Sequence, residues 1–71
     1  MIKLKDLTPE LVEMVLNPDC NIKNWERLRH VLLLRLGKRH TQDEIAQLFG
    51  VSKERIRQLE NRAISILNKK I

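Results

Sequence analysis

The stretch HTQDEIAQLFGVSKERIRQLENRA, residues 40–63, restricts the fold more than any other part of the chain. It contains two candidate helix starts, Thr41 and Ser52, only eleven residues apart, with Gly50 between them. Thr41 can cap the amide of Glu44, and the Glu44 carboxylate can reach back to Thr41, which is the capping-box pattern that opens a helix. Gly50 can take the left-handed conformation with which helices often end. Two short helices joined by a tight turn are therefore expected here.

Each of these two helices has one apolar side. In the first, that side is formed by Ile45, Leu48 and Phe49. In the second, steps of about 100° per residue gather the apolar side chains in one arc: Ile56, Leu59, Ala63, Ile66 and Leu67. The opposite arc holds polar and charged residues: Lys53, Glu54, Arg57, Gln58, Asn61 and Ser65, with Arg55 and Arg62 on its flank. One arc of the second helix is expected in the core, and the other presents a row of hydrogen-bonding groups.

Two short helices with a Gly-containing turn, the second with a polar face, are typical of a helix-turn-helix. A small side chain at Ala46 allows the helices to approach where they cross. Val51, Ile56 and Leu59 are placed to fill the wedge between them. The pattern therefore predicts a helix-turn-helix whose second helix is the recognition helix.

The polar face of that helix has the chemistry for the DNA major groove, where the first two turns of a recognition helix meet base edges. Lys53 can donate to guanine O6 and N7, Glu54 can accept from cytosine N4, and Gln58 can pair with the adenine edge. Each such contact contributes about 1–3 kcal/mol of discrimination when well placed. The arginines of this helix are expected to bond phosphates and set the register: Arg55, Arg57 and Arg62.

The remainder of the chain predicts two more helices. Thr8, Pro9 and Glu10 form an N-cap, a first-turn proline and a first-turn acid, and Asn17-Pro18-Asp19 ends that helix. A further helix begins near Asn21 or Asn24 and stops at Gly37. Its apolar face repeats at helical spacing: Trp25, Leu28, Leu32 and Leu36.

This helix also carries Val31, Leu33 and Leu34, so its apolar arc is wider than one packing face requires. It is therefore either buried on two sides or covered by a partner. The whole pattern predicts an all-α fold of about four helices with a C-terminal helix-turn-helix. Residues 1–24 form an N-terminal segment with one short helix, and residues 25–71 form the helix-turn-helix domain, the two making one compact unit.

Charge is unevenly distributed along the 71 residues, whose net charge is +5. Residues 1–24 have three lysines against four acidic residues, whereas residues 25–71 have 11 Lys or Arg against five acidic residues. A basic module favours polyanions, nucleic acid first and an anionic membrane surface second. Double-stranded DNA is the expected partner.

Other classes of function are disfavoured. An enzyme is not expected, because the chain has no Gly-rich phosphate loop and no plausible pair of nucleophile and base. No metal or cofactor is expected, because Cys20, His30 and His40 lack zinc-site spacing. The single cysteine and the absence of a long apolar run favour a cytoplasmic protein with no membrane segment.

Residues 27–67, RLRHVLLLRLGKRHTQDEIAQLFGVSKERIRQLENRAISIL, resemble region 4 of the sigma-70 family of bacterial RNA polymerase initiation factors. This region binds the promoter −35 element. The resemblance implies base contacts from Lys53, Glu54 and Gln58. It implies phosphate contacts from Arg35, Thr41, Arg55, Arg57 and Arg62, with contributions from Gln42 and Asp43. It also implies that Leu32, Leu33 and Leu34 belong to a concave surface that holds the flap-tip helix of the polymerase β subunit.

The sequence departs from the family in three places. Lys53 stands where primary sigma factors usually have Arg, which removes a bidentate fork and argues against an identical −35 preference. The loop between Gly37 and Thr41 is shorter than in primary factors. Nothing resembles region 2, which melts the −10 element, so the chain is expected to be either an excised domain or a small stand-alone protein of a bacterium or phage. The Met at position 1 favours a natural start.

The resulting hypothesis is a DNA-binding module of transcription initiation that binds a −35-type element as a monomer and docks on RNA polymerase. An anti-sigma factor or an activator is a further partner in this interpretation. The alternative from another class is a protein-interaction module, a region-4 mimic or anti-sigma partner, with little DNA affinity of its own. A free-standing dimeric repressor is a third interpretation, for which the sequence offers no dimerisation helix.

Overall fold

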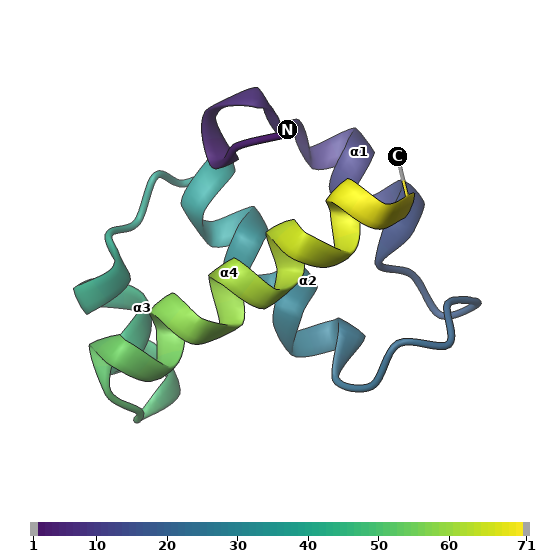
Figure 1. Cartoon of the computed structure of the whole chain (residues 1–71). Coiled ribbons are helices and arrows are strands. Elements are labelled where there is room, and N and C mark those ends of the chain that lie inside the picture. The colour runs from purple at the N-terminus through teal and green to yellow at the C-terminus, as the bar shows by residue number, and fades with distance from the viewer. Residues whose placement is uncertain (1, 71) are drawn as a thin grey trace.

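The computed structural model describes residues 2–70, in which it contains four α-helices and one short 3-10 helix (Figure 1). They are η1 (Leu4–Asp6), α1 (Pro9–Val15), α2 (Trp25–Leu36), α3 (Gln42–Phe49) and α4 (Lys53–Lys70). Residues 2–70 contain no strand. The all-α prediction with four helices and a C-terminal helix-turn-helix is confirmed.

The helices begin where short polar side chains can cap them, with one exception. The Thr8 hydroxyl accepts from the Leu11 amide at 3.2 Å and opens α1. In α2 no side chain caps the first turn, and Asn24 precedes the helix with a left-handed φ of 63°. Asn tolerates this conformation better than most residues, so Asn24 and not Asn21 marks the boundary.

Gly37 ends α2, but it does not adopt the left-handed backbone conformation that is common after a helix. Its φ is −78°, and its amide donates to the Leu33 carbonyl at 2.7 Å. A Cβ added here would lie 3.1 Å from the Leu33 carbonyl oxygen, so the close approach is what favours glycine. The left-handed residue of this loop is Arg39, with a φ of 56°.

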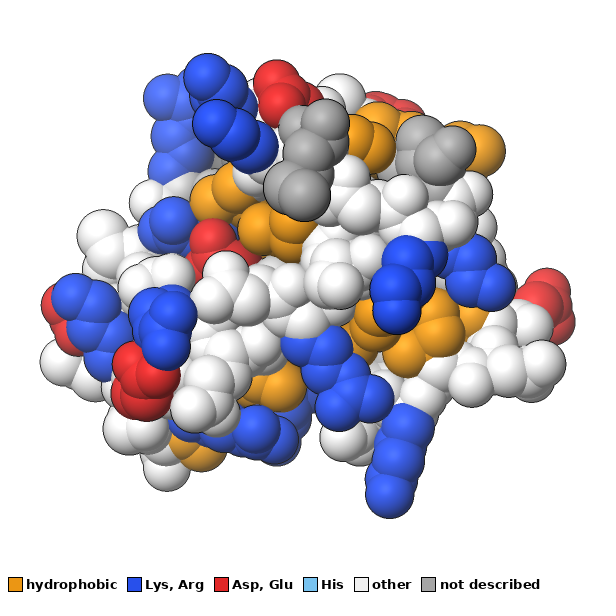
Figure 2. Space-filling model, viewed as in Figure 1, with side chains coloured by type: hydrophobic (Ala, Val, Ile, Leu, Met, Phe, Trp, Pro, Cys, Tyr) orange, Lys and Arg blue, Asp and Glu red, His pale blue; other side chains and the backbone are white. Residues whose placement is uncertain are grey.

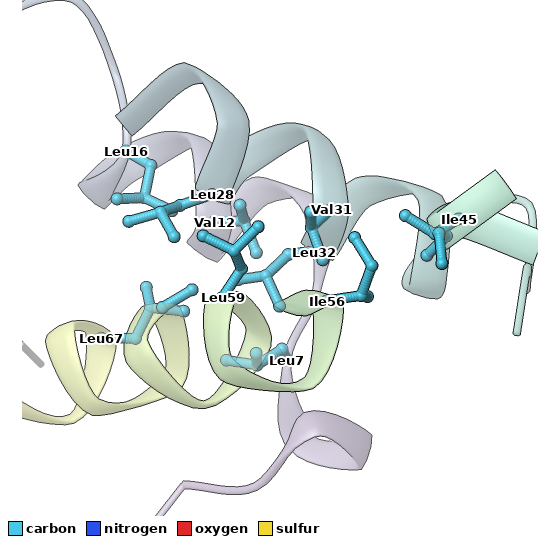
Figure 3. Close-up of a cluster of buried hydrophobic side chains, with 12 residues drawn as sticks. Leu7, Val12, Leu16, Leu28, Val31, Leu32, Ile45, Ile56, Leu59 and Leu67 are labelled. Carbon is cyan, nitrogen blue, oxygen red and sulfur yellow. The ribbon is translucent and has the colours of Figure 1, made fainter. Parts of the chain in front are cut away.

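The core lies where α1, α2 and α4 meet, and α3 packs against one end of α4 (Figure 1). Figure 3 shows side chains of α1, α2 and α4 pointing into a common interior, with Ile45 of α3 at its edge. Twelve apolar residues form this buried cluster: Leu7, Val12, Leu16, Leu28, Val31, Leu32, Ile45, Ala46, Ile56, Leu59, Ala63 and Leu67.

The N-terminal segment packs on the helix-turn-helix through this core, to which it contributes Leu7, Val12 and Leu16. It is also tied to the C-terminal half of α4. The Ile2 amide donates to Asn68 Oδ1 at 2.7 Å, and Asn68 Nδ2 donates to the Ile2 carbonyl at 3.1 Å.

The exposure of two apolar residues bears on the predicted surfaces, and the assignment of one of them, Leu32, was wrong. Leu48, predicted on the apolar side of α3, is 64% exposed, because the short α3 turns only Ile45 and Ala46 fully into the core. Leu32, expected on a partner-binding surface, is fully buried between α2 and its neighbours. It therefore stabilises the fold and has no surface to offer a partner.

Candidate nucleic-acid interface

The helix-turn-helix is built by local hydrogen bonds at the start of α3 and in the turn that follows it. The Thr41 hydroxyl accepts from the Glu44 amide at 3.2 Å, and the Thr41 amide donates to the Glu44 carboxylate at 2.9 Å, which completes the capping box. Gly50 has a left-handed φ of 68°, and the Val51 amide donates to the Ala46 carbonyl at 3.0 Å. The predicted capping box and glycine turn are confirmed.

The first residue of α4 and the face that it buries both agree with the sequence prediction. The Ser52 hydroxyl accepts from the Arg55 amide at 3.1 Å and caps the helix. Ile56 and Leu59 are buried in the same core cluster as Ile45 and Ala46 of α3, and α3 packs against α4. The opposite face of α4 is therefore left toward solvent.

That face carries all of the α4 residues predicted to contact DNA, and each is exposed: Lys53, Glu54, Arg55, Arg57, Gln58 and Arg62. Figure 2 shows Lys and Arg side chains across the side of the molecule on which α4 lies. At the end where α3 and α4 begin, acidic side chains lie next to the basic ones. The exposed face is thus basic, with acids interspersed at its tip.

Two ion pairs join acidic and basic residues at the start of α3 and α4. Lys53 Nζ lies 3.7 Å from Asp43 Oδ2 of α3. Arg57 Nε donates to Glu54 Oε2 at 2.9 Å, and Arg57 Nη2 donates to the other oxygen of the same carboxylate. The Arg57 hydrogen bonds hold the pKa of Glu54 below its ordinary value and raise the pKa of Arg57. Exposed pairs of this kind are weak and screened by salt, so they can exchange for groups on DNA.

The other predicted phosphate contacts differ in their surroundings. Arg55 and Arg62 have no ion-pair partner within residues 2–70. Thr41 already uses its hydroxyl and its amide in the capping box with Glu44. The Thr41 amide, as the main cause, lowers the pKa of the Glu44 carboxyl, and His40 also lowers it. The start of α3 is thus negatively charged.

Arg35 lies in a partly buried polar cluster behind the exposed face. Its Nε is 3.4 Å from Glu60 Oε2, and its Nη1 donates to the His40 carbonyl at 3.2 Å. Gln42 Nε2 donates to the same Glu60 oxygen at 3.0 Å. Glu60 is only 5% exposed and is the one buried charged residue of residues 2–70. Two of the residues that the resemblance assigned to DNA, Arg35 and Gln42, therefore have an intramolecular partner.

The sequence pattern did not single out Glu60. A signal was nevertheless present, because steps of about 100° place Glu60 beside Leu67 at the edge of the apolar arc of α4. A carboxylate at that edge needs a partner when the helix packs. Only the fold shows that Arg35 and Gln42 supply it.

A groove of about 1050 Å³ lies between α2 and α3. Leu33 and Leu34 line it, and Leu32 does not. Its other lining residues are Asn24, Trp25, Glu26, Arg27, Arg29, His30, Leu48 and Phe49. The Arg27 guanidinium lies 5.4 Å from the centre of the Phe49 ring, and Arg29 lies 5.0 Å from that of Trp25. The groove therefore has a mixed lining, in which apolar residues lie beside arginines placed over aromatic rings.

Neither of two other kinds of site is found in the part of the chain that the structure describes. No three His, Cys, Asp or Glu residues of residues 2–70 are grouped so that they could hold a metal ion. None of the helices in this range is long and apolar enough to cross a membrane.

Comparison with known families gives one match. The family model described as "Sigma-70, region 4" matches residues 26–69, which include nearly all of α2 and α4 and the whole of α3. The match leaves out the N-terminal segment with α1. No solved structure matches the chain.

Proposed function

Because the chain belongs to the sigma-70 region 4 family, whose members are DNA-binding helix-turn-helix domains of transcription initiation, we propose that it recognises a −35-type promoter element and docks on RNA polymerase. The family is one of regulatory DNA-binding domains and not of enzymes. In this role the protein acts in the cytoplasm of a bacterium, with double-stranded DNA and RNA polymerase as its partners.

The observation that carries the DNA half of the proposal is the exposed face at the start of α4. Lys53, Glu54 and Gln58 lie in its first two turns, where a recognition helix meets base edges. They are a donor, an acceptor and an amide that is both, so together they can distinguish base pairs in the major groove. We assign base contacts to these three residues.

Phosphate contacts are assigned to the flanking arginines Arg55, Arg57 and Arg62. All three are exposed on the same helix as the base-reading residues. Arg57 must exchange Glu54 for a phosphate, which is feasible because their pair is exposed. Once Arg57 has bound a phosphate, the Glu54 carboxylate is free to accept a hydrogen bond from a cytosine amino group.

Docking on polymerase is assigned to the groove between α2 and α3. Leu33 and Leu34 provide apolar contacts there, together with Trp25, Leu48 and Phe49. Leu48 is exposed in this groove, so its apolar side chain is available to contact the apolar face of a partner helix. The proposed occupant is the flap-tip helix of the β subunit, as the family resemblance implies.

Selection of duplexes from a random pool, followed by binding titrations over a range of salt concentrations, tests the DNA half. The wild type is expected to enrich one short sequence. Glu54→Ala is expected to lose preference at one base pair without weakening binding to other duplexes, because it also frees Arg57. Arg57→Ala is expected to weaken binding to every duplex and to flatten the salt slope by about one.

The outcomes separate the interpretations. A wild type that enriches no sequence, or a Glu54→Ala variant with unchanged base preference, contradicts direct readout. Binding of a flap-helix peptide without DNA binding supports the interaction module instead. A two-fold symmetric footprint supports a dimeric regulator.

The polymerase half is tested with a peptide of the flap-tip helix and fluorescence anisotropy. Leu34→Asp is expected to abolish binding, because it places a charge among the apolar residues that line the groove. Met14→Asp is the matched control, since Met14 is 73% exposed on α1 and does not line the groove. Equal binding by both variants would contradict docking at this groove.

A further inference from the structure

Glu60 is a charged residue buried in the recognition helix, at the border between its apolar arc and the face proposed to contact DNA. It is 5% exposed, whereas Lys53, Glu54 and Gln58 are all exposed. A buried carboxylate is strongly unfavourable unless charged or hydrogen-bonding groups surround it. The groups that surround Glu60 come from other elements of the fold.

Three segments meet at this one carboxylate. Gln42, the first residue of α3, donates to Oε2 at 3.0 Å. Arg35, near the end of α2, places Nε 3.4 Å from the same oxygen. The Arg35 guanidinium also donates to the His40 carbonyl, so the loop that leads into α3 is held as well.

The hydrogen bond from Gln42 is directional in a way that the surrounding core and the ion pair with Arg35 are not. Apolar packing between Ile45, Ile56 and Leu59 is roughly proportional to buried area and allows small rotations of one helix over another. A hydrogen bond weakens steeply when its angle or length changes. The exposed ion pair of Lys53 with Asp43 also joins α3 and α4, but it is weak. Of the contacts between these helices, the hydrogen bond of Gln42 with Glu60 therefore restricts the angle between them most.

We propose that Glu60 is a positioning residue of the recognition helix: it sets the orientation of α4 relative to α3 and the preceding loop, and so places Lys53, Glu54 and Gln58 against base edges. This inference rests on the proposed DNA-binding function. Arg35 and Gln42 act here through Glu60. Base contacts require placement to a fraction of an ångström, whereas phosphate contacts by long, exposed side chains tolerate shifts.

A positioning role and a purely stabilising role predict different DNA binding. Glu60→Gln keeps the size of the side chain and one acceptor oxygen but removes the charge, which weakens the hydrogen bond from Gln42 and the attraction of Arg35. Val12→Ala is the matched control, because Val12 is fully buried in α1, outside the helix-turn-helix, and its truncation lowers stability as well. Affinities for the selected duplex and for an unrelated duplex are measured for wild type and both variants.

If Glu60 positions the helix, Glu60→Gln lowers the ratio of specific to non-specific affinity by on the order of tenfold, the effect of losing one well-placed base contact. Its affinity for the unrelated duplex and its salt slope stay at the wild-type values, and Val12→Ala leaves the ratio unchanged. A wild-type ratio for Glu60→Gln, or an equal fall for Val12→Ala, overturns the proposal. If Glu60→Gln does not fold, Gln42→Ala, which removes one of the two contacts, is expected to show a smaller fall in the same direction.

A second measurement needs no DNA and separates failure of this proposal from failure of the proposed function. Residual dipolar couplings of backbone amides report the angle between α3 and α4. In Glu60→Gln the couplings of α3 and α4 are expected no longer to fit the wild-type geometry, while those of Val12→Ala still fit. Couplings of Glu60→Gln that fit the wild-type geometry overturn the proposal, even if the wild type binds DNA as proposed. If the wild type selects no DNA sequence, the proposed function fails and the couplings alone decide whether Glu60 sets the angle.

Discussion

Lys53, the first residue of α4, forms an ion pair with Asp43 in the first turn of α3, with Nζ and Oδ2 3.7 Å apart. The tip of the helix-turn-helix therefore places an acid beside a lysine that is proposed to read bases. Both side chains are more than half exposed, so the pair is weak and screened by salt. To bond a guanine, Lys53 must leave Asp43.

Asp43→Asn is expected to strengthen binding to duplex DNA by a factor of about two to five, the range of an exposed ion pair. The cause is release of Lys53 and removal of an acid that repels phosphate. Binding titrations at low salt measure the effect. Asp19→Asn serves as control, because it removes the same formal charge from the exposed loop between α1 and α2, outside the helix-turn-helix. Weaker binding by Asp43→Asn, or an equal gain in both variants, would contradict this role.

Thr41→Ala is expected to lower the free energy of unfolding by about 1 kcal/mol, because the Glu44 amide loses its cap. Thr41→Ser retains a hydroxyl and is expected to stay close to the wild type. Urea unfolding followed by circular dichroism measures both. The capping role is wrong if the two variants are equally destabilised.

The pH dependence of stability should contain a contribution from Glu44. Its pKa in the folded chain is below the ordinary value of 4.5, mainly because the Thr41 amide donates to the carboxylate. As pH falls, the unfolded chain therefore binds this proton first, so the stabilisation is complete above about pH 4.5 and is lost as pH falls through the lower folded pKa.

Urea unfolding of wild type and Glu44→Gln at roughly pH 6 and roughly pH 3 isolates this contribution from that of other carboxylates. The difference in unfolding free energy between the two proteins is expected to be larger at the higher pH. A difference that does not change with pH would show that the Glu44 carboxylate is not coupled to folding.

Leu32→Ala and Leu48→Ala remove the same atoms from opposite environments. Leu32 is fully buried, and its truncation is expected to lower the free energy of unfolding by about 2–5 kcal/mol. Leu48 is 64% exposed, and its truncation should change stability by less than about 0.5 kcal/mol. Thermal or urea unfolding compares them. Similar losses in both variants would contradict the burial of Leu32.

Much of the helix-turn-helix could be predicted because its signals are local. The reciprocal bonds of Thr41 and Glu44 join residues three apart, and Gly50 needs its left-handed conformation whatever it packs against. The polar arc of α4 followed from helical periodicity, and its residues are exposed as predicted. Their contacts with DNA remain a proposal.

Other assignments failed because periodicity describes one helix at a time. The apolar surplus of α2 indicated either double burial or a partner, and the fold divides it: Leu32 enters the core, while Leu33 and Leu34 line a groove. Leu48 follows the apolar spacing of α3 but is exposed, because α3 covers only one end of α4. Which apolar residues stay exposed depends on how much of a helix surface the neighbouring helices cover, and the sequence pattern of one helix does not contain this information.

The amino-acid sequence by itself determined the four helices, the caps of α1, α3 and α4, the glycine turn and the polar, basic face of α4, since each depends on residues within about one turn of one another. Only the tertiary structure decided the partners of Glu60. Arg35 and Gln42 lie 25 and 18 residues before it, and the three meet only once α2, α3 and α4 have packed. Burial then makes their charges interact, because a carboxylate removed from water requires whichever donors the fold brings to it.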